Sequence, residues 1–169
     1  MGTGLSHFDA AGKAVMVDVS QKAETVRRAV ASGKISMNAA AFEAVCKGKA
    51  SKGDVLGVAR IAGIMGTKQT AHLIPLCHPV ATEKAEIEFA YLPKEKTIKA
   101  MCTVITSGKT GVEMEALTGV TITLLTIYDM CKAVDKGMQM FDIRLEEKQG
   151  GKSGQYVRET KEEWYERPL

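Results

Sequence analysis

The stretch GKTGVEMEALTGVTITLLTIYDMCK, residues 108–132, surrounds an apolar run with ionisable side chains. The run is too apolar for a surface helix, because its large aliphatic residues fall on more than one helical face. Glycine or threonine at positions 118, 119, 121, 123 and 126 keeps its middle narrow and lets another helix approach closely. We therefore predict a helix over residues 112–134, buried by a sheet on one side and by a partner chain on another.

Charged residues lie at both ends of this predicted helix, Glu113 and Glu115 at its start and Asp129 and Lys132 at its end. At about 100° per residue Glu115 and Asp129 share a face, but a rise of about 1.5 Å per residue separates them by roughly 21 Å. One small pocket cannot hold both from one copy. Two copies packed antiparallel about a two-fold axis would bring the ends together twice, which predicts active sites shared between subunits. The alternative is a buried helix with ordinary ion pairs at its ends.

Strand patterns precede and follow the helix. Residues 85–91 and 98–104 alternate apolar with polar side chains around a turn that contains Pro93, so they predict a β-hairpin. After the helix, apolar residues at 141, 143 and 145 alternate with charged ones, which predicts a last strand with that alternation.

The N-terminal half is expected to supply one strand and two helices. Residues 24–37 are compatible with a strand, although their alternation is poor. Residues 38–47 and 54–73 predict helices, with Asp54 as the N-cap of the second. The order βααββαβ predicts a ferredoxin-like α+β domain, an antiparallel sheet with its helices on one face, with the long buried helix at a dimer interface.

Length and composition set broader limits. The 169 residues suffice for one domain with a core, and we expect a mobile N-terminal tail over 1–15, a single catalytic domain over 16–154 and a polar C-terminal tail over 155–169. A net charge of +3 favours a local anionic ligand over a surface that coats nucleic acid. The four cysteines show no CxxC spacing and no stretch reaches the roughly 20 apolar residues of a membrane span, so we expect a reduced, cytoplasmic protein that binds neither nucleic acid nor membrane.

Two glycine–lysine turns, at residues 108–110 and 151–153, are candidate phosphate sites. Neither is a Walker motif, because Thr103 and Glu146 stand where that pattern requires glycine. Glycine-flanked lysines after strands still combine exposed N–H groups with a cation, which suits phosphate oxygens. The alternative for both turns, and for Lys52, is a flexible solvated loop.

Cys77 and His78 lie between two prolines, Pro75 and Pro79, which restrict the backbone and present the histidine in a defined pose. A Cys-His pair can indicate zinc or a thiol nucleophile. A zinc site would need a second pair of ligands at suitable spacing, which the sequence lacks, so we predict no metal site.

Asp129 and Lys132 have the i, i+3 spacing of an ordinary helical ion pair. Because they end an apolar helix, a solvated surface pair is the less expected arrangement, and a buried charge must find a partner or shift its pKa. Lysines and carboxylates with shifted pKa values are the groups that proton-transfer chemistry uses.

Five separated blocks carry a family resemblance. They are KGDVLGVARIAGIMGTKQT (52–70), LIPLCHP (73–79), GKTGVEMEALT (108–118), LTIYDMCKAV (125–134) and GGKSG (150–154). In this order they resemble the MoaC family, the cyclic pyranopterin monophosphate synthases of molybdenum cofactor biosynthesis. The resemblance covers the chain from about residue 17 to residue 154.

The resemblance implies conversion of 3′,8-cyclo-7,8-dihydro-GTP to cyclic pyranopterin monophosphate with release of diphosphate. It implies no required cofactor, although Mg²⁺ can accompany the triphosphate, and a homohexamer built as a trimer of dimers. The catalytic positions that it implies are Asp129, Lys132, Glu113 and Lys52. The substrate-binding positions that it implies are Leu76, Cys77, His78, Met114, Glu115, Arg27 and Lys148.

Two other functions stay open on the sequence. A non-catalytic nucleotide-sensing module of the same fold would need the lysines but not Asp129. An RNA-binding domain of this fold would need an aromatic stacking pair in a glycine-rich strand, whereas Phe89 and Tyr91 lie in an acidic strand.

Overall fold

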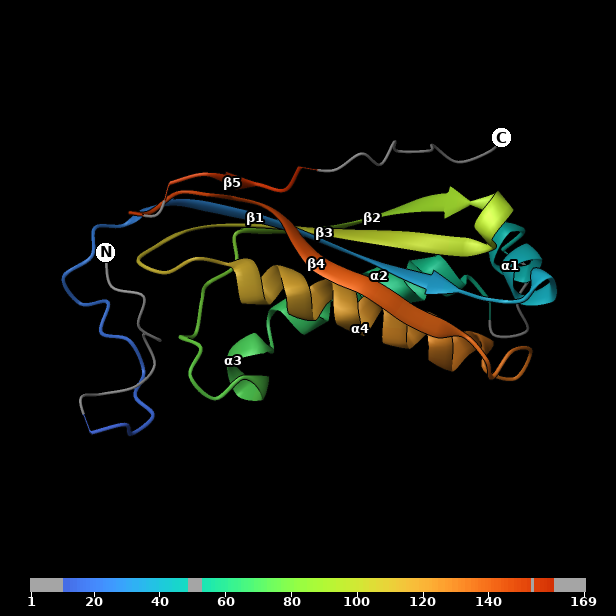
Figure 1. The fold of residues 1–169 in the computed structure, drawn as a ribbon, viewed down its shortest axis with the longest axis horizontal. Helices are drawn as coiled ribbons and strands as arrows, with labels where there is room; N and C mark the ends of the chain where they lie inside the picture. The colour runs from blue at the N-terminus through green and yellow to red at the C-terminus, as the bar shows by residue number, and fades with distance from the viewer. Residues whose placement is uncertain (1–10, 49–52, 153, 160–169) are drawn as a thin grey trace.

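The protein is built on one antiparallel sheet with its helices on one side (Figure 1). The computed structural model describes residues 11–48, 53–152 and 154–159. The order of neighbouring strands is β2-β3-β1-β4-β5, which confirms the predicted ferredoxin-like α+β fold. The strands are β1 (Thr25–Ser36), β2 (Lys84–Leu92), β3 (Thr97–Gly108), β4 (Gln139–Gln149) and β5 (Tyr156–Val157). The helices are α1 (Ala39–Cys46), α2 (Val55–Thr67), α3 (Thr70–Leu73) and α4 (Glu113–Cys131), with the 3₁₀ turn η1 (Pro93–Glu95).

The core lies where α4 packs on β1 and β3. Gly33 of β1 shows how close the two layers are, because a Cβ at this position would lie 2.8 Å from Leu124 Cδ1 of α4. Ala31 and Ile35, which share the strand face of Gly33, are fully buried. Small residues in β1 therefore let α4 lie directly on the sheet, and this contact fixes the position of both ends of the helix.

α4 also packs against α2 at a narrow contact. A Cβ on Gly63 of α2 would lie 2.1 Å from Thr123 Oγ1 and 3.0 Å from the carbonyl oxygen of Gly119, both in α4. The close approach predicted from the small residues of α4 is confirmed, and the helix that approaches is α2 of the same chain. None of the described helices combines the length and the apolarity needed to cross a membrane.

Segment ends agree with the prediction in part. Asp54 is the N-cap of α2, as predicted, and its side chain accepts a hydrogen bond from the first turn. The helix predicted over residues 54–73 is nevertheless interrupted after Thr67. The hydroxyl groups of Thr67 and Thr70 donate to the carbonyl oxygens of the residues three positions earlier. These hydrogen bonds give the carbonyls of Ile64 and Thr67 a partner at the turn between α2 and α3. The short strand β5 was not predicted, because its pairing with the end of β4 is set by the loop between them.

Two β-bulges change the face on which residues of β4 lie. The first is in the middle of the strand, where Lys34 of β1 pairs with Phe141 but Ser32 pairs with Arg144, so two residues of β4 stand against one of β1. Asp142, inside this bulge, has a left-handed backbone with a φ of 56°. Phe141 consequently shares the face of Lys34, and the alternation predicted for this strand is wrong at Phe141.

The second bulge lies nearer the end of β4. Ala31 pairs with Leu145, whereas the preceding residue of β1, Val30, pairs with Glu147. One residue of β4 is skipped, which reverses the alternation of side chains beyond this point. As a result Lys148 lies on the face of the sheet that α4 covers.

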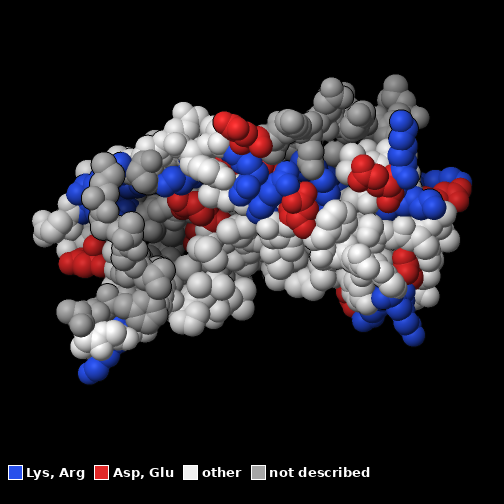
Figure 2. All heavy atoms as spheres, viewed as in Figure 1, with Lys and Arg blue, Asp and Glu red and all other residues white. Residues whose placement is uncertain are grey.

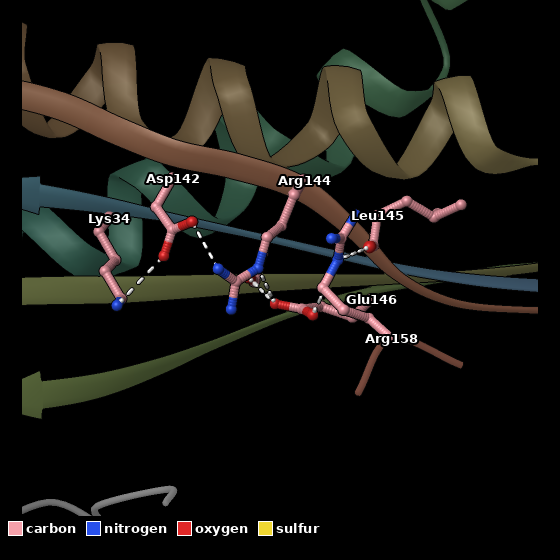
Figure 3. A network of polar contacts seen from close by, with 7 residues as sticks. Lys34, Asp142, Arg144, Leu145, Glu146 and Arg158 are labelled. Atoms are coloured by element: carbon pink, nitrogen blue, oxygen red, sulfur yellow. Dashed lines mark hydrogen bonds and ion pairs between the residues drawn. The ribbon is translucent and has the colours of Figure 1, made fainter. Parts of the chain in front are cut away.

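The face of the sheet away from α4 carries a network of charged side chains (Figure 3). Asp142 accepts from Lys34 at 3.2 Å and from Arg144 at 2.5 Å. Arg144 also donates to Glu146 at 3.0 Å, and the hydroxyl of Ser32 donates to the same carboxylate at 2.5 Å. Figure 2 shows basic and acidic side chains interspersed in the middle of this view, so this region does not form a patch of one charge.

Candidate active site

A cavity of about 590 Å³ lies at the start of α4. Its wall comes from the segment before β1, the start of β1, the β3–α4 loop, and the end of β4 with the loop after it. We call it the basic cavity, because its one acidic lining residue, Glu113, faces six basic ones. These are Lys22, Arg27, Arg28, Lys109, Lys148 and Lys152. Such a concentration of positive charge suits a polyanion such as a phosphate chain.

Arg27 is a buried cation of the basic cavity, with 8% of the residue exposed. Its Nε donates to the carbonyl oxygen of Gly108 at 3.2 Å, and its Nη2 donates to that of Lys109 at 3.4 Å. Both acceptors belong to the end of β3 and the loop that leads into α4. The guanidinium is therefore fixed against this loop rather than extended into solvent.

Lys148 enters the basic cavity because of the second bulge in β4. Its Nζ lies 3.7 Å from Glu113 Oε1 at the start of α4. The neighbouring Arg28 lies on the other face of β1 and pairs with Glu147 at 2.5 Å. The bulge thus places Lys148 on the side of α4, whereas Arg28, which also lines the basic cavity, is paired with Glu147.

A second cavity, of about 310 Å³, adjoins the basic cavity. We call it the loop cavity, because residues 76–78 of the proline-bounded loop form part of its wall, opposite Met114 and Glu115 of α4. Four residues line both cavities, so one elongated ligand can extend from one into the other. They are Lys22, Thr110, Gly111 and Glu113.

Glu115 is a buried carboxyl group of the loop cavity, with 4% of the residue exposed. Burial raises its pKa above the ordinary value and the charge of Glu113 adds to the increase, although a backbone hydrogen bond acts in the opposite direction. A carboxyl with a raised pKa keeps its proton to higher pH and can serve as an acid as well as a base. Burial and the charge of Glu115 also raise the pKa of Cys77, which favours the thiol over the nucleophilic thiolate.

Asp129 and Lys132 lie at the opposite end of α4 and form an ion pair of 2.7 Å. Their side chains are 60% and 53% exposed, so the expectation that a solvated pair is unlikely here is wrong for the single chain. The hydrogen bond that Lys132 donates to Asp129 raises the pKa of Lys132, and the carboxylate charge adds to the increase. With Glu115 and Asp129 roughly 21 Å apart along the helix axis, one chain does not bring these groups together.

The structure therefore divides the predicted site residues into two groups. One group lines the two cavities at the start of α4: Arg27, Leu76, Cys77, His78, Glu113, Met114, Glu115 and Lys148. The other group is the Asp129–Lys132 pair. Lys52 lies outside the described residues. Among the described residues no cluster of three or more His, Cys, Asp or Glu side chains could hold a metal ion.

The sequence indicated some of the cavity residues and not others. Lys109 and Thr110 belong to a glycine–lysine turn that was a candidate phosphate site, and both line the basic cavity. Lys22 and Arg28 were not singled out. Lys22 stands in no recognisable motif, and the place of Arg28 depends on the pairing of β1 with β4, which no local pattern reveals.

Comparison with known proteins gives the family. The sequence model of the MoaC family matches residues 16–151. The chain is 54% identical over 159 residues to the cyclic pyranopterin monophosphate synthase of Clostridium botulinum (strain Alaska E43 / Type E3), covering 94% of this chain and 100% of the relative. It is 56% identical over 155 residues to the cyclic pyranopterin monophosphate synthase of Desulfitobacterium hafniense (strain DSM 10664 / DCB-2), covering 92% of this chain and 94% of the relative. The chain therefore belongs to the MoaC family.

Proposed function

We propose that the protein is a cyclic pyranopterin monophosphate synthase of molybdenum cofactor biosynthesis. It converts 3′,8-cyclo-7,8-dihydro-GTP to cyclic pyranopterin monophosphate and releases diphosphate. The observation that carries the proposal is the identity of 54% and 56% to two relatives of that name along almost their whole length. The cavities support it independently, because a cation-rich space adjoins a buried carboxyl group.

The basic cavity is the proposed site of the triphosphate. Closure of the cyclic phosphate requires a sugar hydroxyl oxygen to form a bond to the α-phosphorus while the bond from that phosphorus to the diphosphate breaks. The hydroxyl proton passes to a base and the diphosphate leaves as an anion. Cations held on the phosphate oxygens stabilise this developing charge, and Arg27, Lys148 and Lys109 line the cavity.

The loop cavity is the proposed site of the guanine-derived ring. Opening of the five-membered ring and its rebuilding as a pyranopterin require proton transfers at nitrogen and carbon. Glu115, with its raised pKa, and Glu113, between the two cavities, are placed to exchange protons with a ring there. Leu76, Cys77, His78 and Met114 supply the remaining contacts.

Asp129 and Lys132 are proposed to complete the site from a second copy as its acid/base pair, with Lys52 as a further catalytic residue. An apolar surface on the helical side supports a second copy. Val58, Ile61 and Met65, one helical stripe of α2, are 47%, 62% and 61% exposed. An apolar hollow of about 260 Å³ lies between α3 and α4 nearby. Figure 2 shows mainly uncharged side chains in the middle of the lower edge, where Figure 1 places α3 and much of α4. The proposed assembly is a homohexamer, a trimer of dimers.

The reaction as proposed needs no redox step, because the substrate and the two products have the same overall oxidation level. No cofactor is required, and Mg²⁺ can accompany the triphosphate as its counterion. The proposed location is the cytoplasm.

The test is release of diphosphate and formation of pterin from enzymatically prepared 3′,8-cyclo-7,8-dihydro-GTP. We expect turnover by the parent protein and a loss of about 100-fold or more in kcat for Asp129→Ala, as for removal of a general acid or base. The matched control is Glu43→Ala, which removes the carboxylate of another exposed ion pair, between Glu43 of α1 and Lys47 at the end of that helix, and should leave turnover unchanged. Binding of the substrate without turnover by the parent would contradict the proposal and favour a nucleotide-sensing regulator.

A further inference from the structure

Three glycines in the loop after β4 have left-handed backbones, Gly150, Gly151 and Gly154, with φ angles of 94°, 79° and 66°. They differ in their surroundings. A Cβ at Gly154 would have nothing within 4 Å, whereas a Cβ at Gly151 would lie 1.7 Å from Arg27 Nη1. Backbone conformation alone explains the glycine at 154, but the glycine at 151 also makes room for a guanidinium group.

The guanidinium of Arg27 is held from two sides. Its Nε and Nη2 donate to the carbonyls of Gly108 and Lys109 in the segment that leads into α4. Its Nη1 lies against Gly151, in the loop that follows β4. Arg27 and Gly151 both line the basic cavity. The arginine is thus inserted between the two glycine–lysine turns of the chain.

We infer that Gly151 is a positioning residue for Arg27. The missing side chain at this position is the space that the guanidinium occupies, and the contact sets the direction in which its remaining N–H groups face the basic cavity. The inference rests on the proposed function, in which this cavity binds a phosphate chain. Direction matters because a planar guanidinium binds phosphate through paired donors, unlike the rotating ammonium of lysine.

A double-mutant cycle tests this role with Gly151→Ala and Arg27→Ala, each alone and combined. The readouts are the Kd for inorganic diphosphate, the KM and kcat for the cyclised GTP, and urea unfolding. In the parent background we expect Gly151→Ala to raise Kd and KM about tenfold or more, as for a misdirected charge-assisted hydrogen bond, with a smaller change in kcat. In the Arg27→Ala background the same substitution should change Kd and KM less than about twofold, because no guanidinium remains to be displaced.

Gly154→Ala is the matched control, since it imposes a similar left-handed strain in the same loop without touching Arg27. We expect its Kd and KM to stay within about twofold of the parent values. Equal effects of Gly151→Ala in both backgrounds, or an equal effect of Gly154→Ala, would overturn the inference, because strain of the loop would then explain the loss.

Folding and function can be separated in the same set of proteins. If Gly151→Ala fails to fold, Arg27→Ala should restore its folding by vacating the space, and an unfolded double variant beside a folded Gly154→Ala overturns the inference. A parent that binds diphosphate with the expected cycle but does not turn over substrate leaves the inference standing and removes the proposed function. If the parent turns over substrate but the cycle shows no coupling between Gly151 and Arg27, the proposed function stands and the inference is overturned.

Discussion

Glu115 is a carboxyl group removed from water and placed beside a second carboxyl group. In the fold its pKa is raised, first by burial and then by the charge of Glu113. In the unfolded chain it titrates near the ordinary glutamate value of about 4.3. As the pH rises from there, the unfolded chain loses its proton first, so the free energy of unfolding falls until the folded pKa has been passed. Ionised Glu115 is therefore tolerated at the expense of stability.

We expect Glu115→Gln to become more stable relative to the parent as the pH rises from about 4 to 8, because the amide never ionises. Its turnover should fall about 100-fold if it takes part in proton transfer. Urea unfolding across this pH range at one protein concentration measures the first effect. Glu86→Gln is the control in which the stability difference should change in the opposite direction with pH. A hydrogen bond from Lys84 lowers the pKa of exposed Glu86, so this variant should become less stable relative to the parent as the pH rises. A stability difference for Glu115→Gln that does not vary with pH would contradict the argument.

Residues that line the loop cavity could be singled out where motif and chemistry coincide, as for His78 in its proline-bounded loop and Glu115 at the start of an apolar helix. Lys22 could not, because it reaches the cavities through the path of an irregular segment. The exposure of Asp129 was also misjudged: its neighbours Met130 and Cys131 are buried at the end of α4, whereas Asp129 lies on the exposed face of the same turn.

At the scale of elements, the contact between α2 and α4 depends on residues without side chains. We expect Gly63→Ala to destabilise the protein by roughly 1 to 3 kcal/mol, because its Cβ would meet Thr123 Oγ1 at 2.1 Å. The cost of the steric overlap outweighs the gain in helix stability of about 1 kcal/mol that alanine has over glycine. Urea unfolding measures the change.

Thr123→Ala in the Gly63→Ala background is the matching test, since it removes the nearest atom and should recover part of the loss. Full recovery is not expected, because the carbonyl oxygen of Gly119 would still lie 3.0 Å from the added Cβ. Stabilisation by Gly63→Ala alone would show that the two helices move apart at little cost.

Elements with a local signal were predictable and those set by pairing were not. The hairpin of β2 and β3 and the long helix α4 follow from periodicity in their own residues. The alternation of β4 fails at Phe141, because the bulge at Asp142 is imposed by register against β1. β5 has only two residues, too few for a periodic pattern.

At the scale of the whole molecule, the distance between the two ends of α4 predicts complementation between subunits. Glu115→Ala and Asp129→Ala should each be inactive alone. Mixed at equal concentration under conditions that exchange subunits, they should regain about one quarter of the parent activity, since half of the dimers are mixed and each has one intact site of two. Activity assays with native mass spectrometry measure recovery and exchange together.

The apolar stripe of α2 provides the control for this complementation. Ile61→Glu introduced into both partners should abolish the recovery by weakening the contact between copies, whereas Ile61→Val, which keeps the surface apolar, should not. No recovery despite demonstrated exchange would contradict a site built from two chains.

The two bulges make the length of β4 more important than its composition. Each skipped residue shifts the reading frame of the strand, so that its start, middle and end follow three different frames against β1. Lys148 faces α4 because the second skipped residue reverses the alternation of the middle frame. With both bulges retained, deleting or inserting a single residue in the middle of β4 would carry this lysine to the opposite side of the sheet without altering any residue that lines the cavity. The spacing along this strand is therefore itself a determinant of the site.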